Sequence, residues 1–211
     1  MRLVARTTWL STFCLLGLWG VAAADSTFDI GAGVATPLGD VNRYWGQGIS
    51  VNASYLYETT PFIAFGLSGG YHKMALDRGA YRRNVGLASD ADVSGGDLSV
   101  ITACGEFRLK TGAMDKAAFY GCLGLGVFIV GISDLTAPSA VTGIETTVSF
   151  DSATRIGGYA GAGFGLPVSP RLKIGADARY NLYSVRQNSD LRGVGQTRQF
   201  VTVRAMAILG L

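Results

Sequence analysis

The chain has 211 residues, of which 48% are hydrophobic and only 16% are charged, and its formal net charge is +3. So small a net charge gives no basis for binding nucleic acid through bulk electrostatics, and the length suits one domain. A single histidine and three cysteines without clustered spacing indicate no metal site, and no motif indicates a cofactor.

The first 24 residues have the pattern of a secretory signal peptide. Arg2 and Arg6 precede an apolar stretch, and an Ala-Ala-Ala run ends at Ala24. The alternative is a membrane anchor, but a spanning helix needs about 20 apolar residues and this stretch is shorter. We expect cleavage after Ala24, which leaves residues 25–211 as one domain. That domain has 16 basic residues against 15 acidic ones, a net charge of +1.

The remaining sequence contains segments of about ten residues in which apolar and polar side chains alternate, which is typical of β-strands. In the first, for example, Phe28, Ile30 and Ala32 share one parity. Turn residues separate the segments, so each is predicted to be a strand. The eight predicted strands are residues 27–36, 47–57, 62–72, 97–109, 117–130, 154–166, 171–184 and 199–210.

The two faces of these strands indicate a barrel in a membrane. One parity is apolar, whereas the other is small, polar or charged, as in the strand 171–184 with its inward Lys173, Asp177 and Arg179. A soluble barrel would hold its apolar face inside, but a charged, glycine-rich face suits a wet interior and a lipid exterior. Short connections at 58–61, 110–116 and 167–170 alternate with longer ones. We predict an eight-stranded antiparallel transmembrane up-and-down β-barrel with both termini in the periplasm.

Glycine fills much of the inward parity of the segment 156–166. Because an eight-stranded barrel is just wide enough for its own side chains, inward glycines leave room for long side chains from other strands. If Leu166 pairs with Leu172, Gly161 lies opposite Asp177 and Tyr180 covers Gly158. A dinucleotide-binding loop is the alternative for "GAGFG", but that motif needs a following helix, and Pro167 and another strand follow instead.

The run "GYAGAGFGLPVSPRLKIGADARY" resembles the penultimate hairpin of the small bacterial outer-membrane β-barrel proteins of the OmpA/OmpX and opacity-protein kind. The signal peptide, the eight strands and the loop pattern extend this resemblance over the whole chain. It implies a location in the bacterial outer membrane and insertion by the barrel assembly machinery. The resemblance specifies an architecture and no activity.

Cys104 and Cys122 lie in neighbouring predicted strands on either side of the turn 110–116. A hairpin centred on Ala113 places them directly opposite each other on the inward face, with Phe107 opposite Phe119 outside. An oxidising periplasm would then permit a disulfide. The alternative is two buried free thiols, because a slip of one residue would separate the faces.

Several charged residues carry the inward parity and are candidates for an interior charge network. Paired charges are the expected filling of a narrow barrel, since an unpaired buried charge is costly. The alternative is the lining of a narrow porin-like channel for small solutes. The candidates are Glu106, Arg155, Lys173, Asp177, Arg179 and Arg204.

The histidine at position 72 raises the possibility of a lipid-modifying enzyme with a serine–histidine–acid set. Ser68 shares its parity, but four residues of strand separate the two by about 13 Å, against the ~3 Å that activation requires. Ser94 and Ser99 are no better indicated by the sequence. We therefore expect no enzymatic activity, no catalytic residues and a solvated histidine near a strand end.

The longer connections are the best candidates for function, because loops on rigid scaffolds usually carry it. The connection 132–153 is predicted to extend its flanking strands as a hairpin. We expect a structural or surface-interaction role, with outer-membrane lipids and lipopolysaccharide as partners and an unidentified surface ligand possible. Basic loop residues suited to lipopolysaccharide phosphates are Arg82, Arg83, Arg186, Arg192 and Arg198.

Overall fold

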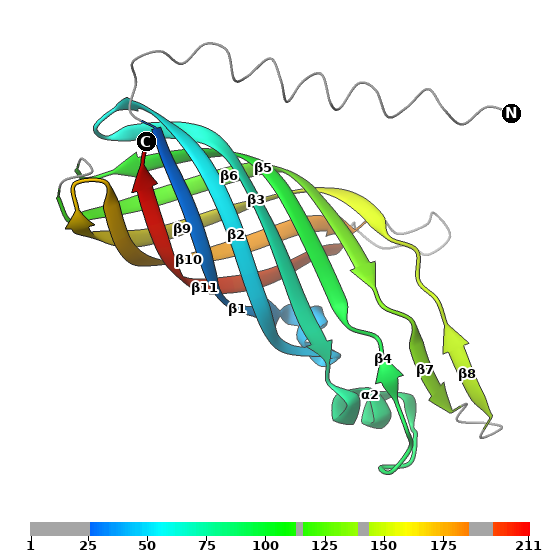
Figure 1. Ribbon diagram of the computed structural model, residues 1–211. Helices are drawn as coiled ribbons and strands as arrows, with labels where there is room; N and C mark the ends of the chain where they lie inside the picture. The colour runs from blue at the N-terminus through cyan, green and yellow to red at the C-terminus, as the bar shows by residue number, and fades with distance from the viewer. Residues whose placement is uncertain (1–25, 113–115, 139–143, 186–195) are drawn as a thin grey trace, which may run out of the picture.

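The computed structural model describes residues 26–112, 116–138, 144–185 and 196–211, and the predicted signal peptide therefore lies outside the described residues. Eight strands form one closed antiparallel barrel in which every strand pairs with its neighbours in the chain, and the first strand pairs with the last. The predicted fold class is confirmed (Figure 1). The barrel strands are β1 (Ser26–Leu38), β2 (Trp45–Thr60), β3 (Ile63–Leu76), β5 (Leu98–Lys110), β6 (Ala118–Ile132), β9 (Ala153–Ser169), β10 (Leu172–Val185) and β11 (Gln196–Gly210).

The two faces of the wall differ as the alternation predicts. Apolar side chains of the outward face are exposed, among them Leu125 at 79% and Ile156 at 78%. Charged side chains of the inward face are buried, among them Arg108 and Asp177. An exposed apolar belt around a buried polar interior is the reverse of a water-soluble barrel.

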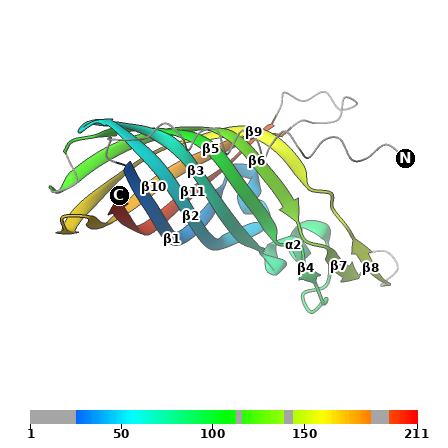
Figure 2. The same ribbon diagram turned by 45° about the horizontal axis from the view of Figure 1, so that its top comes forward.

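The two ends of the barrel also differ. One end, which we call the short-turn end, holds the start of β1, the end of β11 and the short turns after β2, β5 and β9 (Figures 1 and 2). The other, the long-loop end, carries η1 (Gly39–Arg43), α2 (Arg78–Val85), β4 (Ser94–Gly95), β7 (Leu135–Pro138) and β8 (Glu145–Val148). In the described residues, no helix is long and apolar enough to cross a membrane.

The predicted hairpin in the connection 132–153 is present as β7 and β8. These strands pair with each other, and β4 joins them as the third strand of a small sheet beyond the barrel. Thr136 and Thr147 lie opposite each other and their hydroxyls are 2.9 Å apart. The helix α2 continues from β3, and the Asp77 carboxylate caps it by accepting a hydrogen bond from the Ala80 backbone N–H.

The glycines of β9 do leave room for large side chains. A Cβ atom at Gly163 would overlap the ring of Tyr120, and one at Gly161 would press on Arg179 and on the Cys122 sulfur. The predicted register, however, is wrong by two residues. Leu166 lies opposite Ile174, because the turn is tight enough to pair Ser169 with Leu172 and a one-residue bulge follows next to Leu172. Gly161 therefore lies opposite Arg179, Asp177 lies opposite Gly163, and Tyr180 lies opposite Ala160.

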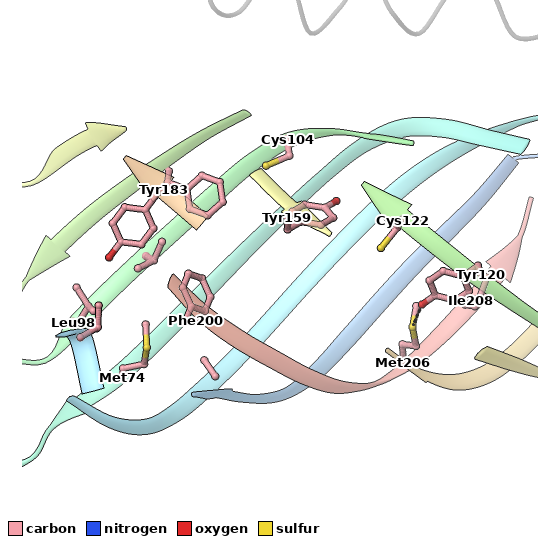
Figure 3. Close-up of a cluster of buried hydrophobic side chains, with 14 residues drawn as sticks. Met74, Leu98, Cys104, Tyr120, Cys122, Tyr159, Tyr183, Phe200, Met206 and Ile208 are labelled. Atoms are coloured by element: carbon pink, nitrogen blue, oxygen red, sulfur yellow. Dashed lines mark hydrogen bonds between the residues drawn. The ribbon is translucent and has the colours of Figure 1, made fainter. Parts of the chain in front are cut away.

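The buried apolar side chains inside the barrel form one cluster, in which Cys104, Cys122 and Tyr159 lie between a group at each end (Figure 3). Tyr120, Met206 and Ile208 make the group nearer the short-turn end, where the Tyr120 hydroxyl donates to the Met206 sulfur. Met206 and Ile208 share the inward parity of Arg204 on β11, and they pack in this group. The group nearer the long-loop end includes Met74, Leu98, Phe128, Tyr183 and Phe200.

Candidate functional site

The centre of the barrel holds a connected set of charged side chains, which we call the interior network: Asp29, Glu106, Arg108, Asp177, Arg179 and Arg204. Glu106, on β5, is its most connected member. Its Oε1 accepts hydrogen bonds from Nε and Nη2 of Arg108, at 3.1 and 2.6 Å. Its Oε2 accepts from Nη1 of Arg179 at 3.1 Å and from the Tyr159 hydroxyl at 2.6 Å.

The other carboxylates of the interior network are paired as well. Asp177 binds Arg204 through two parallel hydrogen bonds of 2.9 and 2.6 Å and also accepts from Nε of Arg179. Arg108 reaches Asp29 on β1, with Nη1 2.6 Å from Oδ2. Three carboxylates thus face three guanidinium groups, all of them buried. This balance offsets the cost of removing the charges from water.

Uncharged side chains tie the interior network to the rest of the wall. Tyr159 on β9 joins Glu106 to Ser68 on β3, whose Oγ is 2.7 Å from the phenol oxygen. Ser54 on β2 donates to Glu106, and the Tyr120 ring on β6 lies 4.3 Å beneath the Arg108 guanidinium. All eight barrel strands therefore contribute to one set of contacts that crosses the lumen.

The predicted interior charges lie in different places. Glu106, Asp177, Arg179 and Arg204 belong to the interior network. Lys173 is buried nearer the short-turn end, where it lines a small cavity with the Glu58–Lys110 ion pair. Arg155 lies at the long-loop end, away from the network.

Asp29 and Arg108 were missed by the sequence reasoning, although their parity was informative. Asp29 alternates with outward Phe28 and Ile30, and Arg108 shares the parity of Glu106 two residues earlier. Alternation alone therefore places both side chains inside the barrel.

The predicted pairing of the cysteines is wrong. In the β5–β6 hairpin, Cys104 lies opposite Gly126 and Cys122 lies opposite Arg108, a shift of four residues from the expected register. Both cysteines face the interior, and both are free thiols. Their faces were correctly assigned because an even shift preserves the face of every residue, while it still separates the two sulfurs along the strands.

His72 is buried, and not solvated as the sequence analysis expected. Its Nδ1 lies 2.9 Å from the hydroxyl of Ser50, which is directly opposite on β2, and its ring packs 5.0 Å from that of Phe200. Ser68 binds Tyr159 instead, and Ser99 donates to the Gly131 carbonyl. Among the described residues, no carboxylate hydrogen-bonds to His72, so the pair lacks the acid of a catalytic triad.

A cavity of about 200 Å³, the mouth pocket, lies at the long-loop end of the barrel. Tyr183 stacks on Phe128 beneath it, with ring centroids 5.8 Å apart, and Trp45 is fixed at its side by a 2.8 Å hydrogen bond to the Gly96 carbonyl. Residues that line the mouth pocket are Trp45, Leu98, Val130, Ile132, Asp151, Ala153, Arg155, Tyr183 and Arg198.

The predicted basic loop residues are dispersed. Arg83 is exposed on α2, and the neighbouring Arg82 is half-buried and donates to the Ser89 carbonyl. Arg198 is not in a loop, because β11 begins at Gln196, and it lines the mouth pocket. Arg186 and Arg192 lie outside the described residues.

Comparison with known proteins found a likeness in fold and none in sequence. No family model matches the sequence, and no curated protein matches it. A major outer membrane protein from Thermus thermophilus superposes with a TM-score of 0.52 at 13% identity, covering 90% of this chain and 100% of that one. Neisserial surface protein A gives 0.49 at 17% identity, covering 89% and 99%. OprG, an outer membrane protein from Pseudomonas aeruginosa, gives 0.46 at 15% identity, covering 91% and 98%.

The exposed apolar belt, the closed eight-stranded wall and the structural match with the Thermus protein agree with one another. The chain therefore has the fold of the small bacterial outer-membrane β-barrel proteins.

Proposed function

We propose that the protein is an outer-membrane β-barrel that serves as a rigid scaffold for surface interactions at its long-loop end. The observation that carries this proposal is the inverted wall, with its apolar face exposed and its charged face buried. In lipid, a closed barrel satisfies every backbone hydrogen bond while an apolar belt faces the acyl chains. Insertion would require the barrel assembly machinery.

The asymmetry of the two ends supports one orientation. Outer-membrane barrels have short periplasmic turns and longer extracellular loops. The short-turn end of this barrel, with the start of β1 and the end of β11, would then face the periplasm. The small β4–β7–β8 sheet and α2 would face the outside.

Labelling on intact cells tests this orientation. Thr146 on β8 and Arg171 in the short turn before β10 are both exposed, and the two native cysteines are buried. A membrane-impermeant maleimide should label Thr146→Cys on intact cells and Arg171→Cys only after the outer membrane is broken. The reverse pattern would contradict the orientation, and labelling of neither after lysis in denaturant would mean the variants are not produced.

The filled interior favours the role of a scaffold over the role of a channel. The interior network crosses the lumen, and its three acids and three arginines leave no unbalanced charge to select an ion. An eight-stranded barrel has room for little else. Purified protein in planar bilayers should give no steady discrete conductance. Regular single-channel steps that change with Arg204→Gln would favour the channel.

Lipopolysaccharide is the proposed partner of α2. Arg78 and Arg83 are exposed on this short helix, and guanidinium groups bind phosphates in a bidentate manner. The Arg78→Gln/Arg83→Gln variant should bind lipopolysaccharide micelles more weakly than the unaltered protein, and more so at low salt. Arg171→Gln, which removes one charge at the other end, is the control and should not change binding.

We propose no enzymatic role. The Ser50–His72 pair has a short contact, but both residues are buried inside the barrel, away from the lipid-facing surface. A histidine with one hydrogen bond and one aromatic neighbour is adequately explained as part of the packed interior.

A further inference from the structure

Two arginines and one aspartate line the mouth pocket, so its charged residues carry a net charge of +1. Arg155 on β9 and Arg198 on β11 both line it, and neither forms a hydrogen bond or ion pair with any residue in the described ranges. Asp151 also lines the pocket but is not ion-paired to either of them. Both arginines are half-buried, so an anion between them would gain charge-assisted hydrogen bonds with little competition from water.

The rest of the lining is apolar and held in place. Leu98, Val130 and Ile132 form one side, and the Trp45 indole is anchored by its bond to Gly96. Tyr183 is fixed against Phe128. Such a pre-formed surface suits a flat apolar group, because these apolar side chains need little ordering when the ligand binds.

Size and charge together define the ligand class. A volume of about 200 Å³ is below the usual range for drug-sized ligands, which excludes a long chain or an oligosaccharide from full burial. Inorganic phosphate would leave the aromatic walls uncovered, and a neutral ring would leave the arginines unpaired. We propose that the mouth pocket binds a small aromatic carboxylate, with the carboxylate at Arg155 and Arg198 and the ring against Trp45 and Tyr183.

The floor of the mouth pocket makes it a binding site and not the entrance of a channel. Below Tyr183, the ring of Phe200 lies 6.5 Å away and packs in turn against His72. These side chains are buried, and Tyr183 and Phe200 belong to the apolar group nearer the long-loop end. A ligand that enters from that end therefore stops there.

Trp45 gives this proposal a direct readout. The other two tryptophans are Trp9 and Trp19, within the predicted signal peptide, so Trp45 is the single tryptophan of residues 25–211. Titrating benzoate into the protein purified from outer membranes in detergent should change the Trp45 emission in a saturable way. Trp45→Phe should abolish the signal, which shows that it comes from the pocket.

Matched ligands and variants separate this site from non-specific binding. Benzamide has the same ring without the charge and should bind about tenfold more weakly or worse, and phosphate should bind more weakly too. Arg155→Gln and Arg198→Gln should each weaken benzoate binding by about tenfold. Asp151→Asn removes a charge that repels the benzoate carboxylate and should strengthen binding. Arg83→Gln, on α2 and outside the pocket, is the control and should have no effect.

Three outcomes would overturn the proposal: equal affinity for benzoate and benzamide, unchanged benzoate affinity in both arginine variants, or no saturable change in emission at about 10 mM benzoate. The variants are compared only where unboiled samples keep the gel mobility of the folded barrel. The inference rests on the proposed function in one respect: the proposed orientation lets a ligand reach the mouth pocket from outside the cell. Because binding is measured on purified protein, its failure is distinct from failure of the orientation test.

Discussion

Arg108 and Asp29 meet across the interior of the barrel, with Nη1 of the arginine 2.6 Å from Oδ2 of the aspartate. The two residues are 79 positions apart in the sequence and come from β5 and β1, which are not neighbours in the wall. Both side chains are almost completely buried. The ion pair therefore links two separate parts of the barrel wall across the lumen.

Removing Arg108 should destabilise the barrel strongly. Arg108→Ala leaves Asp29 without its partner and takes two hydrogen bonds from Glu106, and a broken buried pair costs about 3–5 kcal/mol. The measurement is the urea midpoint for loss of the folded gel band in detergent.

The matched control for Arg108→Ala is Lys73→Ala. Lys73 pairs with Asp97 at 3.1 Å, but its side chain is 48% exposed, so its loss should cost less than about 1 kcal/mol. Equal midpoints for the two variants would mean that the interior network does not stabilise the barrel.

Gly124 on β6 should not tolerate a side chain. A Cβ atom there would overlap the Tyr159 ring, which is held by Glu106 and Ser68, so Gly124→Ala should cost about 1–3 kcal/mol. Gly105→Ala is the control, because its Cβ would point outward with no atom nearer than 3.9 Å. If the two variants unfold at the same urea concentration, crowding is not the reason for the inward glycine.

The register of the β5–β6 hairpin can be tested with engineered cysteines. Phe107 lies opposite Leu123, and cross-strand Cβ atoms are near enough for a disulfide. With both native cysteines replaced by serine, Phe107→Cys/Leu123→Cys should cross-link under mild oxidation. Phe107→Cys/Phe119→Cys, the pair that the sequence register favoured, should not. Cross-linking of the second pair alone would show that the register is the one expected from the sequence.

The native cysteines should remain reduced. Because Cys122 lies opposite Arg108 and not opposite Cys104, the denatured, unreduced protein, from residue 25 on, should show two reactive thiols. Absence of reactive thiols before reduction, with two after it, would contradict the structure.

His72 should matter for stability and not for lipid chemistry. His72→Ala removes the bond to Ser50 and the contact with Phe200 and should cost about 2–4 kcal/mol, whereas Ser50→Ala should cost about 1 kcal/mol. Lipid A and phospholipid profiles of the two strains should equal that of the parent. A modified lipid that disappears in both variants would reveal an enzyme.

Alternation in the sequence determines which face each residue takes, and this was enough to predict the eight strands and the barrel. It has a period of two, so it leaves every even shift of register equally acceptable. Cys104 was therefore placed on the correct face but four residues from its true partner. The tight turn between Ser169 and Leu172, together with the bulge beside it, likewise moved Leu166 by two residues without changing its face.

The interior network shows a related limit: the alternation pattern does not tell which inward residues of different strands meet inside the barrel. Parity identifies Glu106 and Asp177 as inward residues, but the tilt of the strands decides which inward residues share a level. Arg155 and Arg179 have the same parity, yet one lines the mouth pocket and the other binds Glu106. The Ser50–His72 contact joins two strands whose register the pattern does not specify.

The most direct test of the central claim is the gel mobility of the outer-membrane fraction, with and without boiling. A closed barrel held by its wall and its interior network should stay folded in detergent at room temperature and migrate differently after boiling. We predict such a heat-dependent shift for a protein that sediments with the outer membrane. A protein with one mobility under both conditions, recovered from the soluble periplasm, would contradict the account.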